Sequence, residues 1–413
     1  MPLGAFAIAT PKMAQPQAFP IHPTKQFTQA NAAVRRPREI ACFSFDEEHR
    51  YRQDDSSMRY YYPPTLPADL SKGFDSFRQL DDTGDDHLDG LLQALIHHEG
   101  ERRAKLETDF VTWRGMMTKI MIVPFSNFDS WEMNATKFQD TMFVEENHQK
   151  KLDSRQEQYS QAPVRGAMSQ DLMSYWGYKF ETLSLLDRHW CYTERSEIET
   201  REDAQVSNYA QYCSIVRTGF GKSKIVIGGE VDAVYDSKPP TLGAPVNWVE
   251  LKTTAELVNE KEVNKYERKL LKFWAQSFLL GVPKIVVGFR DQQGWLRRLE
   301  ELDTQTIPDK IQKTGRKLWD GQTCINFASA FLEWLKVTMD TEGVWRIRKR
   351  EKSPVLEVFK VEETGTGNIL SDAFVEWRTS ILPNILAAQQ VQTVNSTRSG
   401  PGVLTSDGDG KPP

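Results

Sequence analysis

Acidic side chains lie inside the most strand-like segments of this 413-residue sequence. The segments IVIGGEVDAVY and VNWVELKT are rich in β-branched residues, which favour strands. Each carries two charged side chains two positions apart: Glu230 with Asp232, and Glu250 with Lys252. Because side chains alternate along a strand, both members of each pair are expected on one face. Charges in strands that look buried need partners, so these pairs limit how the chain can fold.

If the two segments are neighbouring strands, three carboxylates and one ammonium group converge. Like charges this close repel each other unless another group compensates them. A divalent cation is the usual compensation, and Mg²⁺ takes oxygen ligands from carboxylates and substrate phosphates. Lys252 would then stabilise negative charge developing on a phosphate oxygen. The alternative is that each pair lies on an ordinary surface strand, since both spacings are common.

The order of predicted elements indicates an α/β core with mixed sheets. Strands are predicted at 212–218, 225–235, 246–253 and 284–291, and helices at 113–121, 172–186 and 260–281. The last helix carries an apolar stripe formed by Tyr266, Leu270, Phe273, Trp274 and Phe278. Its opposite face carries Lys265, Lys269, Lys272 and Gln276. That face is either a solvated charged face or one that approaches a phosphate or a base edge.

Composition restricts the partners and the metal. Lys plus Arg is 52 and Asp plus Glu is 57, a net charge of −5, so contact with a polyanion has to be local, in a cleft. The four cysteines and seven histidines show no zinc-binding spacing, which argues against structural zinc and for an intracellular protein with reduced thiols. A metal would have carboxylate ligands, which favours magnesium or manganese. No apolar stretch is long enough to cross a membrane.

The two ends of the chain differ from the body in composition. Residues 1–36 hold scattered Pro, Gln and Ala, and residues 391–413 are polar and rich in Gly and Pro. Both are predicted to be disordered tails around a single domain at 37–390.

Nine short motifs follow one another along residues 37–390. They are CFSFD (42–46), MRYYYPP (58–64), TWRG (112–115), GYKFE (177–181), CSIVR (213–217), GEVD (229–232), VELKT (249–253), KLLKFWAQSFLLGVP (269–283) and GFRD (288–291). Each is weak alone, but in this order they resemble the DXO/Rai family of RNA 5′-end decapping enzymes. The resemblance covers nearly the whole body. It implies two mixed β-sheets flanked by helices, related to the D/ExK nuclease class.

The resemblance also implies roles for individual residues. The metal ligands, for one or two Mg²⁺ or Mn²⁺ ions, would be Glu181, Glu230, Asp232, Glu250 and the backbone carbonyl of Leu251. The catalytic residues would be Glu230, Asp232 and Lys252. Substrate contacts would come from Trp113, Arg114, Gly115, Cys213, Glu230, Lys252 and Gln276, with Arg114 facing the RNA 5′ end. For Cys213 the alternative is a small buried apolar residue, and for Arg114 a salt-bridged arginine on an amphipathic helix.

The activity implied is metal-dependent hydrolysis in RNA 5′-end quality control. Substrates would be RNA with a 5′-triphosphate, an incomplete cap or an NAD cap. Family members either act alone as decapping exonucleases or partner a nuclear Rat-type 5′→3′ exoribonuclease. The residues of the motifs EIACFSFD and MRYYYPP resemble the fungal members of the family. We therefore expect a Rat-type exoribonuclease as partner and a nuclear location. Two alternatives remain: a non-catalytic brace for the exoribonuclease, and a DNA nuclease of the D/ExK class.

Overall fold

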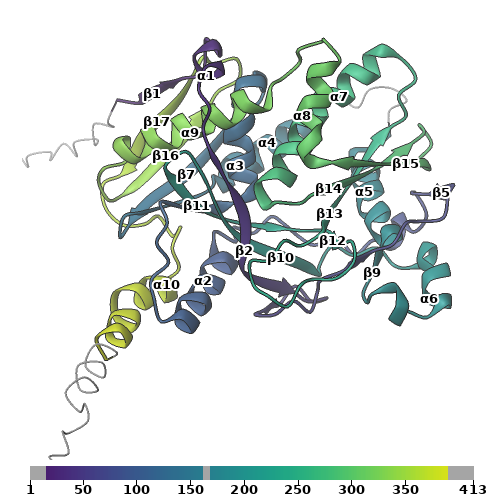
Figure 1. The fold of residues 1–413 in the computed structure, drawn as a ribbon, viewed down its shortest axis with the longest axis horizontal. Coiled ribbons are helices and arrows are strands. Elements are labelled where there is room, and N and C mark those ends of the chain that lie inside the picture. Colours follow the sequence, from purple (N-terminus) through teal and green to yellow (C-terminus); the bar gives the residue numbers. More distant parts are fainter. Residues whose placement is uncertain (1–14, 161–167, 389–413) are drawn as a thin grey trace, which may run out of the picture.

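The computed structural model describes residues 15–160 and 168–388 (Figure 1). Within them, the strands form one ten-stranded and one seven-stranded sheet. Each sheet contains both parallel and antiparallel neighbours. The predicted architecture of two mixed sheets with helices is therefore confirmed.

The strand order of each sheet departs from the order along the chain. The ten-stranded sheet runs β1 (Gln17–Pro20), β17 (Val355–Glu362), β16 (Val344–Lys349), β7 (Trp131–Phe138), β8 (Thr141–Glu146), β6 (Phe110–Trp113), β11 (Ser223–Glu230), β10 (Gln211–Phe220), β2 (Val34–Phe45) and β3 (Tyr51–Arg52). The seven-stranded sheet runs β5 (Ala68–Asp69), β15 (Trp295–Asp303), β14 (Lys284–Arg290), β13 (Trp248–Ala255), β12 (Ala233–Val234), β4 (Tyr60–Tyr61) and β9 (Leu185–Leu186).

Three helices share one apolar core with both sheets. They are α3 (Arg114–Ile122), α7 (Glu260–Leu280) and α9 (Gly321–Thr338). In β11, Ile225 and Ile227 enter this core, whereas Val226 enters a second core on the other face of the strand. Burial on both faces explains why the strand reads as a continuous apolar run.

The outer faces of the sheets are covered by other helices. Helices α2 (Asp89–Arg102) and α10 (Asp372–Glu376) lie side by side on the ten-stranded sheet (Figure 1). Helix α5 (Gln170–Ser184) packs on the seven-stranded sheet against Val249 and Leu251 of β13. The remaining α-helices are α1 (Lys25–Thr28), α4 (His148–Ser160), α6 (Arg195–Glu199) and α8 (Ile307–Lys313). No helix in the described ranges is long and apolar enough to span a membrane.

The prediction of a disordered N-terminal tail is wrong for residues 15–36. Strand β1 pairs antiparallel with β17, α1 follows it, and β2 already begins at Val34. Phe19 and Phe27 are buried against the rings of Phe327 and Phe331 on α9. Because only two separated aromatic residues hold this segment, its sequence shows no hydrophobic periodicity, and its composition alone suggested disorder. Residues 1–14 and the predicted C-terminal tail at 391–413 lie outside the described residues.

A pair of glycines brings the start of α3 against the end of β11. Gly228 of β11 lies opposite Trp113 of the parallel strand β6. A Cβ atom at Gly228 would lie 2.8 Å from the Trp113 ring, and one at Gly229 would lie 2.9 Å from Cβ of Arg114. Arg114, the first residue of α3, is therefore held close to Glu230, the last residue of β11.

We predict that Gly228→Ala lowers the free energy of unfolding by about 1–3 kcal/mol, because the added methyl group overpacks the Trp113 ring. Urea unfolding followed by circular dichroism measures this loss. Gly177→Ala on α5 is the matched control, since its Cβ would meet nothing within 4 Å. A helix favours Ala over Gly, so the control should be neutral or more stable by up to about 1 kcal/mol. Equal effects of the two substitutions would contradict the close approach.

Candidate active site at the junction of the two sheets

The chain crosses from one sheet to the other at the predicted acids. Glu230 ends β11 of the ten-stranded sheet, and Ala233 begins β12 of the seven-stranded sheet. Asp232 therefore lies in the crossover, not on a strand that neighbours β13. The predicted strand at 225–235 is divided into β11 and β12, which belong to different sheets, and only β12 is a neighbour of β13. The acids still approach Glu250, because β12 pairs with β13 and sets Ala233 opposite Val249.

Glu250 is the most buried member of the site. Its side chain is 0% exposed, and its Oε2 accepts a hydrogen bond of 2.9 Å from Nη1 of Arg114. Its Oε1 lies 2.7 Å from Nζ of Lys252. Burial alone would raise the pKa of Glu250, but Arg114 and Lys252 outweigh burial and lower that pKa to about 2. Glu250 is therefore ionised at neutral pH.

The two cations are held charged by the same cluster. Burial opposes the charge of Lys252, but Glu250 and then Asp232 raise its pKa above the ordinary value. The pKa of Arg114 is likewise raised, by Glu250 and Asp232 against burial. The ion pair with Glu250 joins α3 to β13 across 136 residues of sequence. Arg114 was predicted to face the RNA 5′ end; in this structure its guanidinium contacts Glu250.

Burial and neighbouring carboxylates raise the pKa of each of the other three acids. Burial and then Glu250 raise the pKa of Asp232 to about 7, although its Oδ2 accepts a 2.5 Å hydrogen bond from the Leu251 amide. Burial and then Asp232 raise the pKa of Glu181 well above its usual range. Burial and the nearby Glu250 raise the pKa of Glu230, although Arg114 opposes them. The Glu230 side chain is exposed, so solvent screens these charges more strongly than it does for the other acids. All four acids thus influence one another.

Two adjoining cavities are lined by five of the eleven predicted site residues. A cavity of about 350 Å³ is lined by Glu181, Leu251 and Lys252, together with Lys269 and Lys272 of α7. A cavity of about 810 Å³ is lined by Gly115, Gln276 and Lys272, among others. Lys272 lines both, so the two cavities meet at this residue.

Two predicted substrate contacts lie just behind the acids. Cys213 is buried and pairs with Glu230 across β10 and β11. Burial and the nearby Glu230 raise the pKa of this thiol, so it stays protonated and matches the small apolar alternative. Trp113 donates a 3.1 Å hydrogen bond from Nε1 to the His87 carbonyl oxygen and packs edge-on against Phe43. Nothing in the sequence singled out His87 as this support, because the contact is made by a backbone carbonyl.

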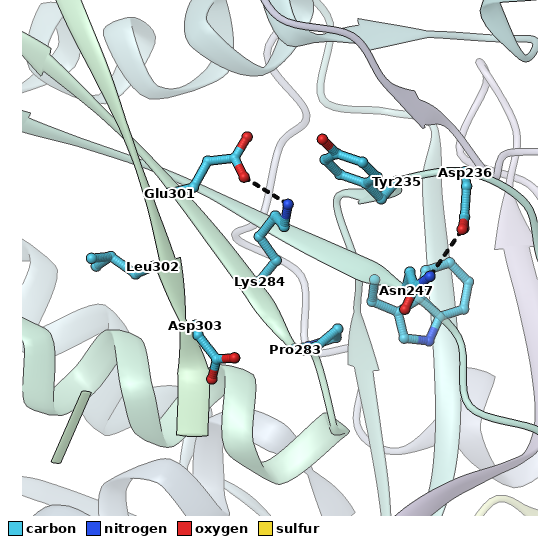
Figure 2. A pocket seen from close by; sticks show the side chains of 9 residues that line it. Tyr235, Asp236, Asn247, Pro283, Lys284, Glu301, Leu302 and Asp303 are labelled. Atoms are coloured by element: carbon cyan, nitrogen blue, oxygen red, sulfur yellow. Dashed lines mark hydrogen bonds and ion pairs between the residues drawn. The ribbon is translucent and has the colours of Figure 1, made fainter. Parts of the chain in front are cut away.

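A third cavity, of about 570 Å³, lies at the ends of β13, β14 and β15 (Figure 2). Figure 2 shows its one lysine, Lys284, paired with Glu301 at 2.6 Å, and Lys284 also lies 3.8 Å from the Tyr235 ring centroid. Asp236 and Asp303 add further negative charge. None of the predicted site residues lines this cavity, and its charge would repel a phosphate.

The donor set suits a divalent cation, although two of its carboxylates contact other groups of the protein in this structure. Within residues 15–160 and 168–388, no three Asp, Glu, His or Cys side chains are grouped closely enough to hold one ion. Glu250 faces the two cations, and Asp232 faces the Leu251 amide. An oxygen-only donor set and three acids with raised pKa values fit Mg²⁺ or Mn²⁺.

Mixed sheets that carry an acidic cluster and a lysine at their junction define a nuclease of the D/ExK type. The family described as "RAI1 like PD-(D/E)XK nuclease" matches residues 35–375, and the chain belongs to this family. The resemblance drawn from the motifs is confirmed, as is the enzyme class.

Curated relatives and solved structures agree with this assignment. The decapping nuclease RAI1 of Aspergillus fumigatus is 59% identical over 360 residues, covering 87% of this chain and 98% of that protein. The decapping nuclease RAI1 of Emericella nidulans is 57% identical over 364 residues, covering 88% and 99%. A crystal structure of Candida albicans Rai1 in complex with pU5-Mn²⁺ has a TM-score of 0.81 at 29% identity, covering 89% and 100%. Rai1 of Scheffersomyces stipitis, in complex with (3′-NADP)⁺ and a calcium ion, has a TM-score of 0.77 at 29% identity, covering 85% and 98%.

The raised pKa of Asp232 predicts a pH-dependent stability. Folding moves this pKa from an ordinary value of 3.8 to about 7. Such an acid contributes stability that is complete below the unfolded pKa and is lost as the pH rises through the folded pKa. We expect the Tm of the metal-free protein to fall from about pH 5 to about pH 8, and to fall less in Asp232→Asn.

Differential scanning fluorimetry at constant ionic strength measures these profiles. Asp309→Asn is the control, because Asp309 is an exposed acid on α8. Its profile should match that of the wild type. A profile of Asp232→Asn that also matches the wild type would contradict the raised pKa.

Proposed function

We propose that this protein is a divalent-metal-dependent hydrolase of RNA 5′ ends. Its substrates are RNA with a 5′-triphosphate, from which it removes pyrophosphate, and RNA with an incomplete cap or an NAD cap. The observation that carries this proposal is the buried Glu250, held between Arg114 and Lys252 beside a cavity that Glu181 also lines. The ligands of the relatives, pU5-Mn²⁺ in one and (3′-NADP)⁺ with calcium in another, support the same substrate class.

The residues divide the chemistry among them. Glu181, Glu230, Asp232, Glu250 and the Leu251 carbonyl would hold the metal. When bound, Mg²⁺ or Mn²⁺ supplies Lewis acidity and an activated water. Lys252 stabilises negative charge on the reacting phosphate. Gln276 and Gly115 line the neighbouring cavity and orient the first nucleotide. Cys213 takes no part as a nucleophile, because burial keeps its thiol protonated.

The double variant Glu230→Ala/Asp232→Ala should abolish hydrolysis while leaving the protein folded, with an unchanged or higher Tm. Removing two mutually repelling acids relieves electrostatic strain in the metal-free state. The assay incubates 5′-triphosphate RNA or NAD-capped RNA with Mg²⁺ or Mn²⁺ and identifies the released small molecule. Wild type should release pyrophosphate or intact NAD, and so should the control Asp309→Ala.

Three outcomes of this assay would count against the proposal. A large loss of Tm in the double variant would indicate a structural ion network. Faster cleavage of duplex DNA than of 5′-triphosphate RNA would favour a DNA nuclease. No release from either RNA, with an exoribonuclease still bound and stabilised, would favour the non-catalytic brace.

Lys252→Gln should lower kcat by about 100-fold and change RNA affinity much less, because its charge acts mainly as negative charge develops in the transition state. Single-turnover rates and equilibrium binding in Ca²⁺ separate the two effects. Equal losses in rate and affinity would instead assign Lys252 to ordinary substrate binding.

We further propose that the protein binds and stabilises a nuclear 5′→3′ exoribonuclease and shares its nuclear location. A stand-alone decapping exonuclease is the alternative. The support is an exposed aromatic patch, Trp190 and Tyr192, whose side chains are 55% and 76% exposed. Both rings lie against the ring of His189, which also contacts Tyr60 of β4. Exposed large aromatic residues gathered in one place are typical of protein–protein interfaces.

Trp190→Ala/Tyr192→Ala should weaken capture of the exoribonuclease in a pull-down by at least about tenfold, in line with the loss of interfacial aromatic anchors. RNA 5′-end hydrolysis should be retained. Phe128→Ala is the matched control for capture, since Phe128 is 74% exposed and lines the cavity of about 810 Å³, to which neither patch residue belongs. Full capture by the patch variant would exclude this surface, and no capture by wild type at micromolar protein would count against the partnership.

A further inference from the structure

Two lysines of α7 face the candidate site without an anionic partner. Lys269 and Lys272 line the cavity that also holds Glu181 and Lys252. Across the described ranges, neither ammonium group has a carboxylate within ion-pair distance or a hydrogen-bond acceptor. Burial, then the neighbouring Lys265 and Arg290, lower the pKa of Lys269, so the charges around it are positive.

Four of the five other cations that line the two cavities are paired with a carboxylate, and within the described residues the fifth, Lys150, has no such ion pair. Lys252 contacts Glu250, Lys119 contacts Glu146, and Lys151 lies 3.6 Å from Asp82. Arg155 also contacts Asp82, at 2.7 Å. Lys269 and Lys272 therefore carry positive charge that no carboxylate of the described residues balances at ion-pair distance. Such charge favours binding of an anion from solution.

The position of these lysines identifies the anion. Residues three apart on a helix are neighbours on its surface, so Lys269 and Lys272 can act on one group or on two adjacent groups. They share a cavity with Lys252, which is assigned to the reacting phosphate. Lys272 also borders the cavity of Gly115 and Gln276, so it stands where the substrate passes from one cavity to the other. Lysine binds phosphate as a mobile point charge, without demanding a fixed geometry.

We propose that Lys269 and Lys272 form a second phosphate subsite, which binds a phosphate adjacent to the reacting one. This inference rests on the proposed function, since it assumes that the reacting group is at an RNA 5′ end. The adjacent phosphate belongs either to the leaving group or to the RNA backbone downstream. Both are phosphodiester or pyrophosphate anions, and the subsite recognises their shared charge.

Equilibrium binding without turnover tests the subsite. Three RNAs of one sequence, labelled at the 3′ end and carrying a 5′-triphosphate, a 5′-monophosphate or a 5′-hydroxyl, are titrated in EDTA and followed by fluorescence anisotropy at several salt concentrations. The proteins compared are wild type, Lys269→Gln/Lys272→Gln, Lys269→Arg/Lys272→Arg and Lys313→Gln. Lys313 is an exposed lysine of α8 outside both cavities, so its variant shows the effect of losing one positive charge away from the proposed subsite.

The double Gln variant should bind 5′-triphosphate RNA about tenfold more weakly at low salt. Its salt dependence should be shallower by about 0.7 in log–log slope for each phosphate that the variant no longer neutralises. The Arg variant should retain wild-type binding, which a purely structural role of the lysine side chains does not predict. A weakening confined to the triphosphate assigns the subsite to the leaving group, and an equal weakening on all three RNAs assigns it to the backbone.

Affinity and slope of the double Gln variant equal to those of wild type and Lys313→Gln would overturn the subsite. This outcome is separable from failure of the proposed function. The latter is read from pyrophosphate release by wild type in Mg²⁺ or Mn²⁺, which the binding titration does not require.

Discussion

The buried carboxylate of Glu250 is the constraint on which the rest of the site depends. A fully buried charge is costly unless it is paired and hydrogen-bonded. Arg114 and Lys252 supply that pairing, one from the start of α3 and one from the same strand. Because Arg114 reaches Glu250 from another layer of the fold, the ion pair fixes α3 against the seven-stranded sheet. The Gly228–Gly229 pair makes this approach sterically possible.

The Glu250 carboxylate also bears on how the site would bind a metal and a substrate. In this structure it neutralises two cations, while Glu181, Glu230 and Asp232 lie in the field of neighbouring carboxylates. A divalent cation would reverse this balance, since it compensates the acids and competes with Arg114 and Lys252 for Glu250. Release of those cations would direct their charge to the phosphates of the substrate. The unpaired Lys269 and Lys272 extend that positive surface along α7.

Much of the fold and of the candidate site could be predicted from the sequence. The predictions that were wrong or missing have physical causes. The strands around Glu230 and Glu250 were predictable because continuous β-branched runs are typical of strands buried on both faces. Their pairing was not, because local spacing says nothing about which sheet a strand joins, and the chain changes sheets at Val231 and Asp232. The motif order identified the family, but the contact between Arg114 and Glu250 spans 136 residues and left no local signal. The ordered segment around Phe19 and Phe27 was missed because its stability comes from α9, far along the chain.

Anomalous diffraction from crystals grown with Mn²⁺ tests the central claim most directly. We expect an anomalous peak among Glu181, Glu230, Asp232, Glu250 and the Leu251 carbonyl, with the Glu250 carboxylate turned away from Arg114. An anomalous map with no peak at this position, at Mn²⁺ concentrations that support turnover and with the contact between Arg114 and Glu250 intact, would contradict it.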